Sequence, residues 1–129
     1  RELEARGVDL DYFHLDIDFR RVMDEGADVR GDLRLMKGFL DERGIPLGVI
    51  FTSNSNWKPA SDWAYYQATI AWIEVVDGAI GKPQQMIFQS WLGPAASGAH
   101  EVPLNLPEND PESFSHTRLL LEGLGILER

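Results

Sequence analysis

The sequence predicts an α/β fold built from parallel βα units. Three apolar segments, 12–18, 47–53 and 85–91, have the length and composition of buried strands. Between them lie two segments, 30–43 and 62–77, in which apolar residues recur at helical spacing. Strands that alternate with helices form a parallel sheet, because each helix carries the chain back to the end at which the next strand begins. We therefore expect the element order α-βα-βα-βα.

Glycine and capping residues indicate where the first three helices begin and end. A short helix over 1–6 is expected to end at Gly7, and the helix over 30–43 is expected to end at Gly44. Ser61 is the expected N-cap of the helix that follows it. The residues expected to face the core from the two longer helices are Leu33, Met36, Phe39, Leu40, Trp63, Tyr66, Ile70, Ile73 and Val76.

The last third of the chain combines a long loop with a final helix. Residues 92–110 are rich in proline and show no periodicity, which is typical of a long functional loop. Asp110 or Ser113 is expected to cap the final helix, and Gly123 and Gly125 are expected to fray its end. The apolar residues of this helix are Leu119, Leu120, Leu121 and Leu124.

The spacing of the strand ends predicts a barrel. Asp18, Asn54 and Trp91 follow one another at intervals of 36 and 37 residues. An eightfold barrel uses about 31 residues per unit, so units with longer loops fit one. Three units cannot close a barrel, and the first helix has no strand before it. We therefore expect residues 1–129 to be a single α/β domain, the C-terminal part of a TIM-type (βα)8 barrel. The alternative is a small open three-layer α/β sheet.

Composition excludes several classes of partner. The formal net charge is −9 and the twelve basic residues are scattered, which argues against nucleic acid. No run of apolar residues is long enough to span a membrane. Without cysteine the chain has no disulfide framework and no thiolate metal site. The compartment stays open, and a secreted or periplasmic location is slightly favoured.

Polar side chains gather at the C-terminal ends of the predicted strands. Side chains alternate along a strand, so His14, Asp16 and Asp18 share one face. The next two strands likewise turn polar toward their ends. Because binding sites in parallel α/β folds lie at that edge, we expect a site there. The predicted site residues are His14, Asp16, Asp18, Thr52, Asn54, Gln89, Trp91 and Glu108.

Each of these residues also has a structural alternative. Asp18 alternatively forms an ion pair with Arg20 or Arg21, or caps the turn that follows it. His14 is alternatively a hydrogen-bonded core histidine, and Asn54 a turn residue. The remaining alternatives are core filling for Trp91 and solvation for Glu108.

The third strand and its sequel resemble the end of bacterial proteins with a glycoside-hydrolase-like (βα)8 barrel. The matching motifs are Phe88-Gln89-Ser90-Trp91, Leu106-Pro107-Glu108 and Ser113-Phe114-Ser115-His116. The segments 13–18 and 48–51 are similar to that family's middle strands. The resemblance covers the chain as the C-terminal half of the barrel. It implies a carbohydrate-active hydrolase that binds an oligo- or polysaccharide and needs no cofactor.

The resemblance also implies roles for the site residues. Asp16 or Asp18 would act as acid/base or as electrostatic support, Asn54 and Gln89 would bond sugar hydroxyls, and Trp91 would stack on a sugar ring. One departure matters, because no glutamate ends a strand, whereas barrel glycosidases use two carboxylates on different strands. The missing N-terminal part of the barrel is therefore an expected partner that would carry the proton donor. A further reading is a carbohydrate-binding domain that has lost catalysis.

A second resemblance gives an alternative function. Leu15-Asp16-Ile17-Asp18, followed by Gly48 to Asn54, is similar to the first two motifs of haloacid-dehalogenase-type phosphatases. That likeness implies that Asp16 attacks phosphorus, Asp18 handles the leaving-group proton and magnesium holds the site. Arg20 departs from the family pattern, and the third strand ends without the acids that complete the metal site.

Overall fold

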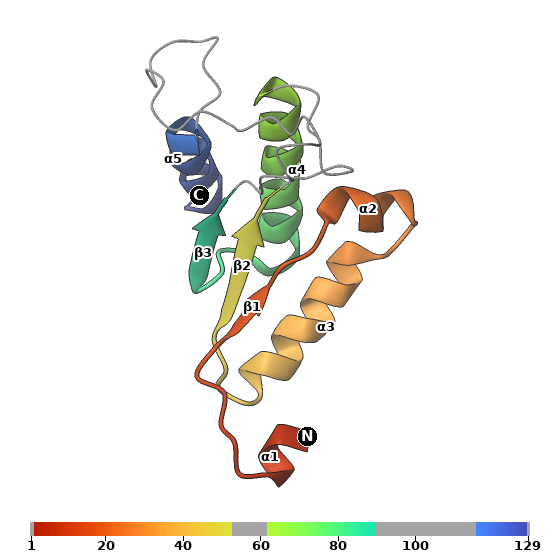
Figure 1. Ribbon diagram of the computed structural model, residues 1–129, viewed down its shortest axis with the longest axis vertical. Helices are drawn as coiled ribbons and strands as arrows, with labels where there is room; N and C mark the ends of the chain where they lie inside the picture. The colour runs from red at the N-terminus through yellow and green to blue at the C-terminus, as the bar shows by residue number, and fades with distance from the viewer. Residues whose placement is uncertain (1, 53–61, 90–115, 129) are drawn as a thin grey trace, which may run out of the picture.

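The protein contains a small parallel β-sheet that runs in chain order. The computed structural model describes residues 2–52, 62–89 and 116–128 (Figure 1). The strands are β1 (Phe13–Leu15), β2 (Leu47–Phe51) and β3 (Gln85–Phe88). Their order in the sheet is β1-β2-β3, and both pairings are parallel. The predicted α/β class and its parallel sheet are therefore confirmed.

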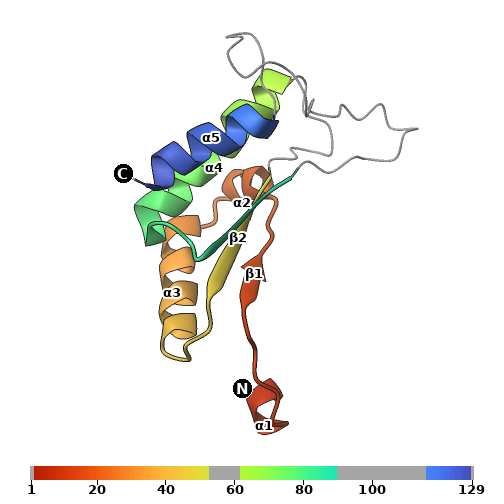
Figure 2. The same cartoon turned by 90° about the vertical axis from the view of Figure 1, so that its left-hand side faces the viewer.

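The long helices lie on one face of this sheet. The helices are α1 (Glu2–Ala5), α2 (Phe19–Asp24), α3 (Val29–Asp41), α4 (Asp62–Ile80) and α5 (His116–Leu127). Figure 2 shows α3, α4 and α5 together on one side, with α4 between the other two. The small three-stranded sheet is consistent with the alternative of a small α/β domain, although within the described residues the sheet and these helices form two layers and not three.

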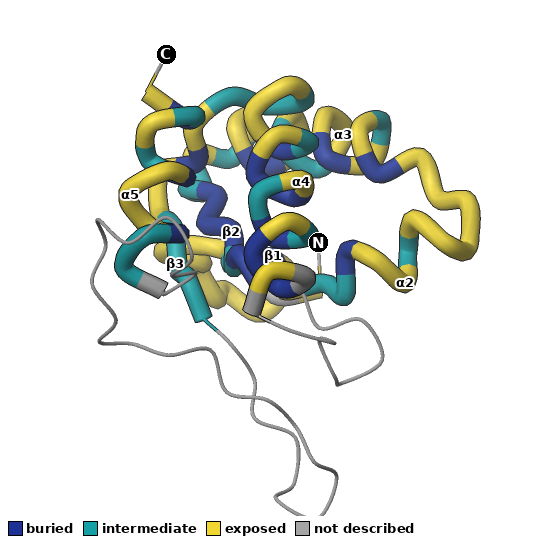
Figure 3. The backbone as a smooth tube through the Cα atoms, turned by 90° about the horizontal axis from the view of Figure 1, so that it is seen from above, coloured by how far each residue is buried: buried dark blue, intermediate teal, exposed yellow. Residues whose placement is uncertain are grey.

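The core fills the space between the sheet and these helices. From β2, Leu47, Val49 and Phe51 are buried beneath the helix layer (Figure 3). Among the described residues, Trp72 of α4 is the largest fully buried side chain, with an exposed fraction of 0%. Its indole stacks on Phe19 with ring centroids 5.0 Å apart and meets Phe51 edge-on at 6.3 Å. Trp72 therefore joins α2, α4 and β2 in one apolar cluster.

The first strand is shorter than the predicted span 12–18, and Trp72 supplies the reason. The Phe13 amide donates to the Pro46 carbonyl at 2.9 Å, and a parallel ladder advances two residues on each strand. The Ile50 carbonyl is therefore the acceptor that residue 17 would use. In the structure this carbonyl accepts from the Trp72 indole N–H at 3.2 Å instead. The chain leaves the sheet after Leu15 and turns into α2.

Two helix boundaries agree with the signals in the sequence, and one helix was missed; the predicted N-cap Ser61 lies outside the described residues. Gly7 and Gly44 adopt the left-handed conformation, with φ of 69° and 65°, after α1 and α3. Helix α2 was not predicted, because its six residues are too few to show a period. Asp28 caps α3, where its carboxylate accepts from the Gly31 amide at 3.0 Å.

Several residues expected in the core are exposed instead. Trp63 has an exposed fraction of 45% and Phe39 one of 46%. The Arg43 guanidinium covers the Phe39 ring at 3.6 Å, so this ring is shielded by a cation and not by the core. On α5, Leu119 is buried, whereas Leu120 and Leu121 are exposed. No helix among the described residues is long and apolar enough to cross a membrane.

Gly123 is a packing residue, contrary to the expected fraying of the last helix. A Cβ atom at this position would lie 2.8 Å from Ile73 Cδ1 of α4 and 2.9 Å from Phe88 Cε1 of β3. The absence of a side chain therefore lets α5 approach both elements closely. Helix α5 continues past it to Leu127.

We expect Gly123→Ala to lower the free energy of unfolding by about 1 kcal/mol. The added methyl overpacks the core by about 1–3 kcal/mol, which exceeds the gain of about 1 kcal/mol in helix propensity. Gly125→Ala is the matched control, because a Cβ atom there meets nothing within 4 Å and only the propensity gain applies. Urea unfolding followed by circular dichroism measures both changes. Equal stabilisation by the two substitutions would contradict the close packing at Gly123.

Candidate functional site at the C-terminal edge of the sheet

Two predicted site residues lie side by side at the C-terminal edge. Thr52 and Gln89 follow Phe51 and Phe88, which are partners in the β2–β3 register. The backbone N–H of Gln89 donates to the backbone carbonyl of Phe51 at 3.2 Å, so the hydrogen-bond ladder between the two strands continues one residue beyond them. Thr52 has an exposed fraction of only 4%, whereas Gln89 is half-buried. Gln89 is therefore the more accessible of the two to a ligand.

Tyr65 anchors this edge and was not predicted. Its hydroxyl donates to the Gln89 carbonyl at 2.5 Å, and its exposed fraction is 1%. Burial raises the pKa of Tyr65 to about 12, against the opposing effect of the nearby hydroxyls of Thr69 and Thr52. The phenol is therefore neutral at physiological pH and remains a hydrogen-bond donor to the backbone carbonyl of Gln89. Helix α4 is apolar on most sides, so its periodicity could not single out Tyr65.

The two predicted catalytic acids lie beyond the end of β1. Asp16 is exposed and directly follows the last strand residue, Leu15. Asp18 is half-buried, and its carboxylate caps α2 by accepting from the Arg21 amide at 3.1 Å. The capping alternative for Asp18 is therefore confirmed. The Arg21 guanidinium pairs with Glu25 at 2.9 Å, so this arginine does not form the alternative ion pair with Asp18.

His14 lies nearer the beginning of the strands than Thr52 and Gln89 do. The register places His14, Gly48 and Gln85 in one row across the three strands. A Cβ atom on Gly48 would collide with the imidazole, so glycine opens the space in which the ring lies. Across Gly48 the ring Nε2 is hydrogen-bonded to the Gln85 Oε1.

The predicted constellation therefore divides into two groups. Thr52 lies four positions beyond Gly48, which is about 13 Å at the rise of a strand. His14 bonds to Gln85 and lies with its ring centroid 4.8 Å from that of Tyr12, toward the beginning of the strands. The predicted site residues Asn54, Trp91 and Glu108 lie outside the described residues.

Thr52 and Gln89 thus lie together at the ends of β2 and β3 with the buried phenol of Tyr65 behind them, and the carboxylates of Asp16 and Asp18 follow the end of β1. Among residues 2–52, 62–89 and 116–128, no group of three or more His, Cys, Asp or Glu side chains could hold a metal ion. Comparison of the chain with protein-family models, curated proteins and solved structures gives no match.

Proposed function

We propose that this protein is a carbohydrate-active, hydrolase-like domain that binds a glycan at the C-terminal ends of its strands. The observation that carries the proposal is the position of Asp16, Thr52 and Gln89, which follow the ends of three neighbouring parallel strands. In parallel α/β folds the ligand is bound at this edge. Carboxylates and amides there suit the hydroxyl groups of an oligo- or polysaccharide.

In this proposal each side chain has a distinct role. Asp16 is the exposed carboxylate and acts as acid/base or as electrostatic support for the reacting sugar. Asp18 is held by its cap on α2 and orients the turn that carries Asp16. The amides of Asn54 and Gln89 bond hydroxyl groups, and the indole of Trp91 stacks on a sugar ring.

We also propose that this sheet is part of a TIM-type (βα)8 barrel. Strand order without reversal and long helices on one face are features that a TIM-type (βα)8 barrel requires. The polar pair His14–Gln85 on the opposite face also suits a barrel interior better than a surface packed under further helices. The remaining units would add at the edges of the sheet, and a strand-end glutamate from one of them would supply the proton donor.

A second candidate function is a magnesium-dependent phosphatase of the haloacid-dehalogenase type. It is favoured by the two acids that directly follow β1 and by the hydroxyl of Thr52 at the end of the adjacent strand. The burial of that hydroxyl beside Tyr65 weakens its case as a phosphate ligand. A third candidate, a catalytically inactive carbohydrate-binding domain, keeps the same edge without turnover.

Glycan binding tests the leading proposal. On an array of oligosaccharides the protein is expected to bind a subset of glycans, and Trp91→Ala is expected to lower the affinity for them about tenfold, or about 1.4 kcal/mol. Phe39→Ala is the matched control, because Phe39 is an exposed aromatic residue at the far end of α3. Absence of binding to every glycan, together with no effect of Trp91→Ala on any ligand, would reject the sugar site.

Turnover separates the three candidates. Oligosaccharide cleavage that disappears in Asp16→Asn, while glycan binding persists, identifies the hydrolase. Binding without cleavage in the unmodified protein identifies the binding domain. Magnesium-dependent release of phosphate from p-nitrophenyl phosphate that is abolished by Asp16→Asn would overturn the carbohydrate proposal in favour of the phosphatase.

A further inference from the structure

Strand β1 forms an open edge of the sheet within residues 2–52, 62–89 and 116–128. The Phe13 amide donates to the Pro46 carbonyl, so the backbone groups of Phe13 and Leu15 point toward β2. In a parallel ladder the intervening residue points the other way. The backbone N–H and C=O of His14 therefore face outward, where another strand could pair with them. Open edges of this kind are covered or charged in folded proteins.

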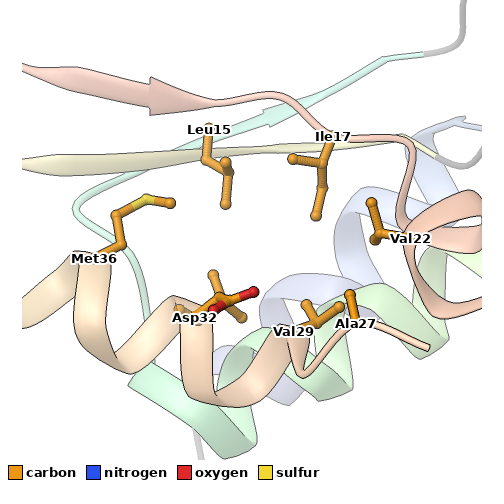
Figure 4. Close-up of a pocket in the computed structure, with 8 residues that line it drawn as sticks. Leu15, Ile17, Val22, Ala27, Val29, Asp32 and Met36 are labelled. Atoms are coloured by element: carbon orange, nitrogen blue, oxygen red, sulfur yellow. The ribbon is translucent and has the colours of Figure 1, made fainter. Parts of the chain in front are cut away.

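An apolar pocket of about 180 Å³ lies beside this edge. Figure 4 shows side chains that converge on it from the β1 exit, from α2 and from α3. Its main lining residues are Leu15, Ile17, Val22, Val29 and Met36. The only polar side chain among its lining residues is the carboxylate of Asp32. A volume of this size accepts one large aliphatic side chain, which gives the edge a second point of attachment.

The opposite edge of the sheet is built differently. Beneath β3, helix α5 approaches so closely at Gly123 that a Cβ atom would meet Phe88 at 2.9 Å. Among the described residues, the β1 edge is therefore the one with an apolar pocket beside it, and we take it as the docking surface.

Acidic side chains surround the β1 edge. Asp9 and Asp11 precede the strand, Asp16 follows it and Asp32 lines the pocket, and all four are exposed. Among the described parts of the chain, no ion pair joins any of these four carboxylates to a basic side chain. Two copies of the protein that met through this edge would bring like charges together, which disfavours self-association. The complementary partner is therefore basic.

We propose that the segment that extends the sheet at β1 is an extended strand of a partner polypeptide, in which Lys or Arg alternates with apolar residues. Its backbone pairs with that of His14, one aliphatic side chain enters the pocket, and its basic side chains lie beside the aspartates. This is strand addition to an exposed edge, in which main-chain bonds give affinity and side-chain pockets give specificity. The inference rests on the barrel part of the proposed function and names the chemistry of the neighbouring strand.

The test uses two short peptides as probes. One alternates lysine with valine around a central leucine, and the other replaces every lysine with glutamate. The lysine peptide is expected to bind the whole chain at low salt, and the glutamate peptide is expected not to bind. Bound lysine peptide is expected to slow hydrogen exchange of the His14 amide at least tenfold, and to leave the amides of Phe13 and Leu15 nearly unchanged because they already face β2.

Two substitutions test the pocket and the charge. Ala27 is an exposed residue that lines the pocket, so Ala27→Leu fills it without opening a cavity and is expected to weaken peptide binding about tenfold. Ala71→Leu makes the same change at an exposed position of α4 and is expected to have no effect. Asp16→Asn removes a carboxylate on the face of His14, where alternation places the basic side chains of the peptide, and is expected to weaken binding about threefold.

Three results would overturn the inference. The first is failure of the lysine peptide to bind, and the second is equal binding of the two peptides. The third is a dimer in sedimentation whose His14 amide is already protected without peptide, because the edge would then pair with a second copy. Glycan binding is measured on the same protein without peptide. A chain that binds glycan but not the lysine peptide therefore rejects this inference alone.

Discussion

Trp72→Ala is expected to lower the free energy of unfolding by about 3–5 kcal/mol. The substitution removes a fully buried indole and its ring contacts with Phe19 and Phe51. It also leaves the Ile50 carbonyl without the indole N–H that it accepts from. Since small domains are stable by about 5–15 kcal/mol, the loss is a large part of the total. Urea unfolding followed by circular dichroism measures it.

Two further substitutions separate packing from hydrogen bonding. Trp72→Phe keeps an aromatic ring against Phe19 but loses the donor to Ile50, so a smaller loss of about 1–3 kcal/mol is expected. Trp63→Ala removes the same side-chain atoms as Trp72→Ala, but at an exposed position of the same helix. It is expected to lower the free energy of unfolding by about 1 kcal/mol or less. If Trp63→Ala destabilised the protein as much as Trp72→Ala, the central place of Trp72 in the core would be refuted.

Raising the pH from about 10 to 12 is expected to remove about 2–3 kcal/mol of stability through Tyr65. The pKa of a tyrosine in an unfolded chain is near 10, whereas burial raises the pKa of Tyr65 in the folded protein to about 12. Below pH 10 the phenol is neutral in both states, and its contribution to folding is fully present. Between these values only the unfolded state loses the proton, so stability falls by about 1.4 kcal/mol per pH unit.

Tyr65→Phe is the control for this pH dependence. At neutral pH it is expected to cost about 1 kcal/mol, because the hydrogen bond to the Gln89 carbonyl is lost. Between pH 10 and 12 the variant is expected to lose about 2–3 kcal/mol less stability than the unmodified protein, so the variant should become the more stable of the two by about 1–2 kcal/mol at pH 12. Parallel loss of stability in both proteins, measured by urea unfolding at each pH, would show that another group is responsible.

The parallel strands could be predicted from sequence because each one is a short apolar run between turn signals. β2 was predicted within two residues, since Leu47 to Phe51 is almost uniformly apolar. The end of β1 could not be predicted, because it depends on Trp72, a residue 57 positions beyond Leu15 in the chain. A local pattern carries no information about such a competitor for the Ile50 carbonyl.

The candidate site was predicted only in part, because local patterns place some of its residues while others depend on residues distant in the sequence. Thr52 and Gln89 lie at one edge because the sheet is parallel and in register, which period and spacing indicate. The partnership of His14 with Gln85 depends on the missing side chain of Gly48 between them, and the sequence offered no sign of it. Phe39 shows the converse case. Its position in a helical pattern predicted burial, but Arg43 covers it at the surface.

The chain-order arrangement of the strands has a consequence for how the protein is made. Phe13 pairs with Leu47 and Gly48 pairs with Gln85, so each strand finds its partner one unit further along the chain. The sheet can therefore grow stepwise as the polypeptide leaves the ribosome, without waiting for a distant segment. It also means that a unit gained or lost at either edge leaves the remaining pairings intact, which makes the βα unit a natural module for duplication and exchange.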